Sequence, residues 1–284
     1  MAWLFLLPAI VGFLVFLAYP VVLGLLLSFT NTNNLNTPLN FVGLRNYQRL
    51  LSDNYFYISL KNNIFYMLTF TPLVIVASLL FALLLNKRIL CRKLFRTVFF
   101  FPYISSMVAV AIIWNYVLSP SGPVNNGLRA IGAASPPEWL LSAEWAMFAV
   151  VIISVWKEFG FYMVVLLAGL QTIPDYLYEA ATIDGAPAWG KFRYVTLPMI
   201  SPTLFLCVIM AVISSFQVFD LVNILTEGGP GSATNVLVFR IYREGFINVK
   251  MGYASAMAYV LFAIIFVLTV IQFKVQNKWV QYNQ

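Results

Sequence analysis

The sequence predicts an all-α polytopic membrane protein with six transmembrane helices, and two observations carry this prediction. The first is composition: the 284-residue chain is 61% hydrophobic and only 10% charged, with a mean hydropathy of +0.85. A soluble domain cannot bury that much apolar surface, whereas a lipid bilayer requires it. The second is segment length, because a bilayer core of about 30 Å needs roughly 20 apolar residues per helix. Six segments qualify, approximately Trp3–Phe29, Ile64–Leu85, Thr97–Leu118, Trp145–Leu170, Pro202–Val222 and Ala254–Phe273.

Local signals bound these segments in turn. The first is too long for the apolar core of a signal peptide, so it predicts a membrane helix. An Asn- and Thr-rich stretch, Asn31–Asn36, follows it, and a basic loop separates the second segment from the third. The turn cluster Pro120–Pro123 ends the third, and Gly228–Gly231 follows the fifth. No internal repeat stands out, so residues 1–284 are expected to form one membrane domain.

Charge predicts the topology. Six crossings place both termini on the same side, and short basic loops stay in the cytoplasm under the positive-inside rule. The basic residues between the second and third segments are Lys87, Arg88, Arg92, Lys93 and Arg96. Both termini, Lys274, Lys278 and the polar segment 171–200 are therefore predicted to be cytoplasmic. The loops predicted to face outward, each long enough for short surface helices, are 30–63, 119–144 and 223–253.

The polar segment 171–200 separates the fourth and fifth apolar segments and reads E-A-A-x3-G-x9-V-x-L-P from Glu179 onward. Thr172-Ile173-Pro174-Asp175 combines a hydroxyl N-cap with a first-turn proline and an acid, so it predicts a helix start. Gly185 is predicted to end that helix, because the residue after a C-cap commonly needs a positive φ. Pro187 is predicted to start a second helix. Two helices joined by a glycine elbow would form a rigid knob suited to a cleft in another protein.

Several kinds of chemistry are missing. The sequence has no His, the commonest metal ligand and general base. Its two cysteines, Cys91 and Cys207, have no neighbouring partner, so neither a disulfide nor a zinc site is predicted. Gly185-x4-Gly190-Lys191 resembles a phosphate-binding loop only weakly, because Phe192 replaces the hydroxyl that would hold Mg²⁺, Pro187 interrupts the loop and no strand precedes it. If ATP drives this protein, a separate subunit must supply the nucleotide site.

Ionisable residues inside apolar segments are costly and raise functional hypotheses. Lys157 and Glu158 lie near the middle of the fourth helix, and as neighbours they point about 100° apart. One could line a cavity while the other contacts a neighbouring helix; the alternative is a buried structural pair. Phe161 and Tyr162 are predicted to lie one turn outward from them.

Polar side chains recur at helical spacing on the fifth helix: Ser214, Gln217 and Asp220, with Ser215 beside them. Together with the aromatic rings of the fourth helix they could bind a sugar, whose hydroxyls take amide and carboxylate partners while its C–H faces stack on rings. The alternative is that these side chains only hold helices together.

The segment Glu179–Pro198 closely resembles the cytoplasmic EAA loop of the membrane subunits of ABC importers, with Val195 in place of the usual Ile. A likeness to carbohydrate-uptake permeases of the maltose, glycerol-phosphate and multiple-sugar type runs nearly end to end. The stretches that carry it are Tyr19-Pro20, Leu27–Phe29, Phe41–Tyr47, Phe95-Arg96, Pro102, Trp114–Pro120 and Leu225–Pro230, where Glu227 replaces Gly or Asn. The resemblance implies the type I ABC importer permease fold, with a coupling helix in the EAA loop.

The resemblance also implies the partners and the site. The chain would be no enzyme and would hold no cofactor, because two ATP-binding subunits bind ATP and Mg²⁺. A second homologous permease and an extracytoplasmic solute-binding protein complete the importer, in the cytoplasmic membrane of a bacterium or archaeon. The residues implied to contact the ATPase are Glu179, Ala180, Ala181, Asp184 and Gly185. The maltose-type sugar site implies Glu158, Phe161, Ser214, Ser215, Gln217 and Val218, to which the patterns above add Tyr162 and Asp220. Glu158 departs from the small residue expected there.

Alternatives stay open at this point. Within the importer architecture, the solute could be an oligosaccharide, a monosaccharide, a polyol or glycerol phosphate. A different function is an ion-coupled secondary transporter that uses Lys157, Glu158 and Asp220 as a proton or sodium relay. An intramembrane enzyme is a further rival, but the sequence lacks His and lacks a carboxylate pair at helical spacing.

Overall fold

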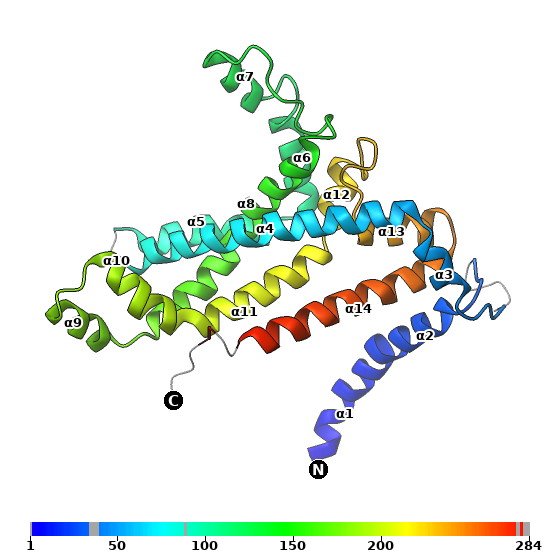
Figure 1. Ribbon diagram of the computed structural model, residues 1–284, viewed down its shortest axis with the longest axis horizontal. Coiled ribbons are helices and arrows are strands. Elements are labelled where there is room, and N and C mark those ends of the chain that lie inside the picture. The colour runs from blue at the N-terminus through cyan, green and yellow to red at the C-terminus, as the bar shows by residue number, and fades with distance from the viewer. Residues whose placement is uncertain (1, 34–39, 88–89, 277–278, 281–284) are drawn as a thin grey trace.

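The computed structural model describes residues 2–33, 40–87, 90–276 and 279–280. Of the loop residues discussed above, Asn34–Asn36, Arg88 and Lys278 lie outside this part of the chain. The described residues form a bundle of helices, with the longest ones side by side (Figure 1). Their bounds, with π-helical turns written η, are α1 (Ala2–Phe13), η1 (Leu14–Ala18), α2 (Tyr19–Ser28), α3 (Arg45–Leu51), α4 (Asn54–Asn86), α5 (Arg92–Ile104), α6 (Met107–Val117), α7 (Pro123–Ala130), α8 (Ala146–Gln171), α9 (Asp175–Ile183), α10 (Ala188–Lys191), η2 (Phe192–Thr196), α11 (Leu197–Phe216), α12 (Asp220–Leu225), α13 (Leu237–Tyr242), η3 (Arg243–Ile247) and α14 (Met251–Gln276).

The helices agree with the predicted number of membrane crossings. Five described helical segments are long and apolar enough to cross a membrane, and the bent pair α5–α6 makes a sixth if it counts as one span. The long polar loops carry the short helices α3, α7 and α13, as expected. The five other spans are Leu6–Ser28, Asn54–Asn86, Ala146–Gln171, Ala188–Leu225 and Met251–Gln276.

Close packing of α8 against α4 and α5 forms the centre of the bundle. Met163 and Leu166 of α8 and Phe70 of α4 are fully buried there. At Gly160 the backbone of α5 comes so close that a Cβ would lie 2.0 Å from the carbonyl oxygen of Phe99. Only glycine permits this approach, so Gly160 sets the position of α5 on α8.

Helix α4 begins well before the predicted start at Ile64. The Asp53 carboxylate caps it by accepting hydrogen bonds from the backbone N–H groups of Tyr55 and Phe56, at 2.9 and 3.4 Å. Its first turns are polar, so hydropathy did not mark them. Asn63 is nevertheless buried, because it accepts a hydrogen bond from the Leu237 backbone N–H (2.7 Å) and donates one to the Ser215 carbonyl (3.1 Å).

The third predicted helix, Thr97–Leu118, is wrong as a single straight span. It divides into α5 and α6, whose axes differ by 97°. Ser105 and Ser106 join them in non-helical backbone, beginning three residues after Pro102. Hydropathy does not register this break, because apolar residues lie on both sides of it. Helix α6 then leads out of the bundle to α7, which projects from it (Figure 1).

The fifth predicted helix, Pro202–Val222, is wrong at both ends. A continuous helical path runs from Ala188 through η2 to Phe216, and Gln217 is its C-cap. A separate helix, α12, starts at Asp220.

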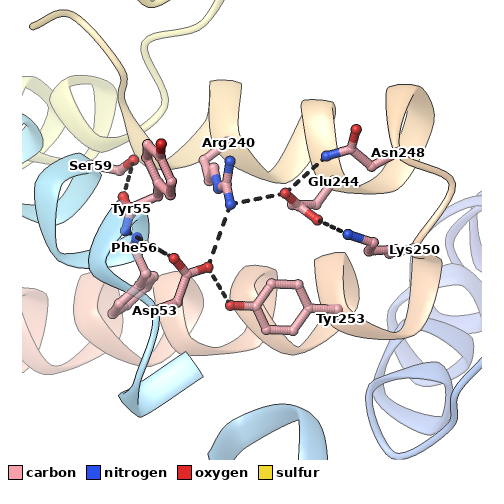
Figure 2. A network of polar contacts seen from close by, with 9 residues as sticks. All are labelled: Asp53, Tyr55, Phe56, Ser59, Arg240, Glu244, Asn248, Lys250 and Tyr253. Carbon is pink, nitrogen blue, oxygen red and sulfur yellow. Dashed lines mark hydrogen bonds and ion pairs between the residues drawn. The ribbon is translucent and has the colours of Figure 1, made fainter. Parts of the chain in front are cut away.

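A cluster of charged side chains joins α4 to α13, η3 and α14 at the end of the bundle away from α9 (Figures 1 and 2). The Arg240 guanidinium lies 2.9 Å from the Glu244 carboxylate and 3.5 Å from that of Asp53. The Tyr253 hydroxyl donates to Asp53 at 2.6 Å, and the Lys250 ammonium lies 3.6 Å from Glu244. Since Glu244 is only 2% exposed, Arg240 balances a buried charge and ties the helices together.

Replacing Arg240 should therefore destabilise the protein. Arg240→Met leaves the buried Glu244 carboxylate with Lys250 as its remaining ion partner, and breaking a buried ion pair from one side costs about 3 kcal/mol. We expect thermal unfolding in detergent several degrees below that of the unmodified protein. Arg243→Met is the matched control, because Arg243 is exposed and makes no ion pair among the described residues. Equal unfolding temperatures for the two variants would contradict the bracing role of Arg240.

Asp53 should make stability depend on pH in the acid range. Burial alone would raise its pKa, but the hydrogen bond from Tyr253 and the positive charge of Arg240 outweigh burial, so the pKa lies below the ordinary 3.8. A carboxyl with a lowered folded-state pKa adds stability above the ordinary pKa, and that stability is lost as pH falls through the folded value. We expect the difference in unfolding temperature between the unmodified protein and Asp53→Asn to be constant from neutral pH down to about 5. It should shrink below 3.8; a difference that grew in acid would be the wrong sign.

Candidate functional site

Two features of the bundle are candidates for function, and the first is the exposed segment between α8 and α11. Helix α9 has no buried residue, and its C-cap Asp184 is followed by Gly185 at φ +73°. Pro187 then precedes α10. The predicted helix, glycine elbow and second helix are confirmed. No heavy atom lies within 4 Å of a Cβ built on Gly185, so backbone conformation rather than space requires glycine here.

The start of α9 differs from the prediction. Pro174 occupies the N-cap position, and the Thr172 hydroxyl instead donates to the Gly169 carbonyl at 2.8 Å. Thr172 thus closes α8 and does not cap α9.

Contacts fix α9 onto the helix that follows it. The Lys191 ammonium donates to the Thr182 hydroxyl at 2.8 Å, and the hydroxyls of Tyr178 and Thr196 lie 3.0 Å apart. Leu177 packs on the central core. By contrast the side chain of Glu179 is exposed. Among the described residues its carboxylate makes no hydrogen bond or ion pair, so it is available to a partner.

The second feature is a cavity of about 410 Å³ between α5, α8 and α11. It combines aromatic rings, charged groups and neutral polar groups within the bundle. Its lining residues are Tyr103, Lys157, Glu158, Phe161, Tyr162, Met210, Ile213, Ser214 and Gln217.

Lys157 joins this cavity to the bend in the third span. Its ammonium donates to the backbone carbonyls of Pro102, Tyr103 and Ser105, at 3.1, 3.1 and 2.9 Å. The last carbonyls of a helix have no partner within the helix, and the negative end of the helix dipole attracts a cation. Lys157 is only 7% exposed, so it acts as a buried cap on α5.

Glu158 points elsewhere, as expected for adjacent helical residues. Its carboxylate accepts a hydrogen bond from the Ser214 hydroxyl of α11 at 3.3 Å, which is long for an O–H···O bond to a charged acceptor. Both residues contact a neighbouring helix, Lys157 on α5 and Glu158 on α11, and both line the cavity. The predicted division of these two roles between Lys157 and Glu158 therefore does not hold.

Aromatic rings form one wall of the cavity. Tyr103 and Phe161 stack with ring centroids 4.8 Å apart, and Phe161 meets Tyr162 edge to face at 5.3 Å. Helix α8 runs toward α9, so Phe161 and Tyr162 lie on the α9 side of Glu158. The predicted position, one turn outward from Glu158, is wrong. Sequence reasoning missed Tyr103, because the bend after α5 brings it to the cavity; Pro102 followed closely by two serines was the available signal.

Three predicted path residues do not line the cavity. Ser215 is buried and its hydroxyl donates to the Val212 carbonyl at 2.6 Å, while Val218 packs on the central core. Asp220 is exposed in the first turn of α12. The predicted stripe is therefore wrong beyond Gln217, because the helix that would have aligned it ends there.

Comparison with known proteins identifies the family. Residues 63–281 match the family described as binding-protein-dependent transport system inner membrane component. The chain is 37% identical over 276 residues to the lactose transport system permease protein LacF of Rhizobium radiobacter, covering 95% of this chain and 92% of LacF. It is 32% identical over 278 residues to the sn-glycerol-3-phosphate transport system permease protein UgpA of Brucella abortus, covering 97% and 94%.

A solved structure has the same fold. A chain in the bacterial alginate ABC transporter, in complex with alginate pentasaccharide-bound periplasmic protein, superposes with a TM-score of 0.87 at 27% identity, covering 100% of this chain and 96% of that one. These matches confirm the predicted ABC importer fold, the multi-pass membrane location and a role in transport rather than catalysis. The chain belongs to the family of binding-protein-dependent transport system inner membrane components.

Proposed function

We propose that this chain is one permease subunit of an ATP-driven importer that brings a carbohydrate into the cytoplasm. One observation carries the proposal: the cavity between α5, α8 and α11 offers stacked rings beside hydroxyl, amide and carboxylate groups. Sugars need this combination, because their C–H faces stack on rings and their hydroxyls need hydrogen-bond partners. The similarity to a lactose permease supports the same solute class.

Partner subunits supply what this chain lacks. A second homologous permease completes the path, two ATP-binding subunits hold ATP and Mg²⁺, and a solute-binding protein delivers the solute from outside. The membership of a binding-protein-dependent family supports the last of these. The basic loop that begins at Lys87 supports a topology with both termini in the cytoplasm, which puts α9 on the side where ATP is bound.

The contacts of α9 suggest how ATP binding reaches the cavity. In this mechanism the ATPase subunits bind α9 through the coupling residues, which are Glu179, Ala180, Ala181, Asp184 and Gly185. A push on α9 passes through the Lys191–Thr182 and Tyr178–Thr196 contacts into η2. The helical path from η2 continues to Phe216, so the motion reaches Ser214 and Gln217 at the cavity and switches its access from one side of the membrane to the other.

Glycerol phosphate or a polyol is a second candidate solute within the same architecture. Similarity to a glycerol-3-phosphate permease over most of the chain supports this second candidate.

The elbow at Gly185 gives a test of coupling. Gly185→Val places a β-branched residue at φ +73°, a conformation such residues rarely adopt, so α9 should lose its orientation. We expect transport to fall to background, while the protein still inserts into the membrane and keeps the unfolding temperature of the unmodified protein. Gly185→Asn is the matched control and should retain much of the activity, because Asn tolerates this conformation. Normal uptake by Gly185→Val would remove the coupling role of α9.

The solute path is tested at Gln217, which is exposed at the C-cap of α11. Gln217→Ala removes a hydrogen bond to a neutral solute, a loss of roughly 0.5–1.5 kcal/mol, so uptake should weaken several-fold or change in solute preference. ATPase activity stimulated by loaded binding protein, measured alongside, should show that the complex still assembles. Gln48→Ala, an exposed glutamine on α3, is the control. Unchanged uptake of every accepted solute would rule out this cavity as the path.

A further inference from the structure

The two charged groups of the cavity are not equally available to a solute. An ammonium has three N–H donors, and three backbone carbonyls of the α5 terminus lie within hydrogen-bond distance of Lys157. A solute carboxylate or phosphate would have to displace these carbonyls to reach the ammonium. Displacement would leave the Tyr103 and Ser105 carbonyls without a partner among the described residues, whereas the Pro102 carbonyl would keep the Ser105 backbone N–H at 3.3 Å. An unsatisfied carbonyl is costly inside a membrane. Lys157 is therefore a poor anion-binding group.

Glu158 is in the opposite situation. A carboxylate offers about four acceptor positions, yet among the described residues Glu158 accepts one hydrogen bond, the long one from Ser214. Glu158 lines the cavity, and the polar groups there other than Lys157, on Tyr103, Tyr162, Ser214 and Gln217, are neutral. A solute rich in hydroxyl donors can satisfy Glu158, whereas a second anion cannot.

The balance of charge also favours Glu158. The carbonyl end of α5 carries about half a negative charge, and this partly cancels the Lys157 ammonium that sits on it. The Ser214 hydroxyl offsets the Glu158 carboxylate far less. In the described lining an ionised Glu158 would therefore make the potential of the cavity negative, although the lining holds one residue of each sign.

We infer that Glu158 is a specificity-determining residue, which admits neutral, hydroxyl-rich saccharides and disfavours uronates and phosphorylated sugars. The inference rests on the proposed function, because it requires the solute to pass through this cavity. It separates this chain from the alginate and glycerol-3-phosphate systems to which it is similar, because alginate and glycerol-3-phosphate are anions.

A thiol placed in the cavity can measure this potential without knowledge of the natural solute. In the transporter assembled with its partner permease and ATPase subunits, Gln217→Cys supplies the thiol and Cys91→Ser removes the exposed native one; Cys207 is buried. The measured quantity is the ratio of labelling rates for a cationic and an anionic methanethiosulfonate of similar size. We expect the cation to react faster, and Glu158→Gln to lower the ratio about tenfold, as one unit charge nearby predicts. Glu158→Asp should restore most of it.

A thiol outside the cavity is the control for general surface charge. Ser121→Cys lies in an exposed turn before α7, and its labelling ratio should not respond to Glu158→Gln. The inference would be overturned if Glu158→Gln left the cation-to-anion labelling ratio at Gln217→Cys unchanged, as it should at Ser121→Cys.

Protection by saccharides tests selection directly. Maltotriose, which is neutral, and trigalacturonate, which is acidic, are added at equal concentration before a small uncharged thiol reagent. Maltotriose should slow labelling of the introduced thiol more than trigalacturonate does, and Glu158→Gln should narrow the difference. Equal effects of the two saccharides in the parent would also overturn the inference.

Failure of the inference can be told from failure of the proposed function. If Gln217→Ala changes uptake while Glu158→Gln leaves both labelling ratio and protection unchanged, the cavity carries solute but Glu158 does not select it. If Gln217→Ala has no effect on uptake, the proposed path itself fails, and the inference fails with it.

Discussion

The contact of the Lys157 ammonium with the carbonyl end of α5 is the interaction on which the rest of the site depends. A bend of 97° in a membrane span leaves backbone carbonyls without the hydrogen bonds that a continuous helix would give them. Lys157 binds three of them, and Gly160, one turn further along α8, lets the α5 backbone lie against the same helix. Because the bend is held there, Tyr103 reaches the cavity and α6 leaves the bundle. Glu158, the next residue along α8, is left to face the cavity.

A mechanical connection follows from the same arrangement. The cavity lies between a wall anchored on α8 and a wall formed by α11, and α11 continues without interruption into η2 and α10. Helix α9 is fixed to that continuous helix by side-chain contacts, and none of its residues is fully buried. The cluster of charged side chains around Glu244 holds α4 to α13 and α14 at the other end of the bundle (Figure 2). Movement of α9 would therefore displace the cavity wall formed by α11, while α4, α13 and α14 stay joined at the end of the bundle away from α9.

Sequence reasoning succeeded where the determinant is local. The elbow at Gly185 follows from the chemistry of one residue, and the divergence of Lys157 and Glu158 follows from helix geometry. It failed where backbone departs from a helix inside apolar sequence. The bend at Ser105–Ser106 does not change hydropathy, so Tyr103 was missed. The stripe through Asp220 assumed that a helix continues past Gln217, and it does not. Likewise the polar first turns of α4 carry no apolar signal, because they are stabilised by contacts such as those of Asn63 with distant segments.

We propose that the bend held by Lys157 builds the cavity that binds the solute. The most direct measurement is a structure of the assembled transporter trapped with a bound saccharide. We expect a sugar ring against the Tyr103–Phe161 wall, with hydroxyls within hydrogen-bond distance of Glu158 and Gln217, and the Lys157 ammonium still on the α5 carbonyls. A saccharide that contacts none of these side chains, or a Lys157 ammonium that has left the carbonyls to bind the solute, would contradict it.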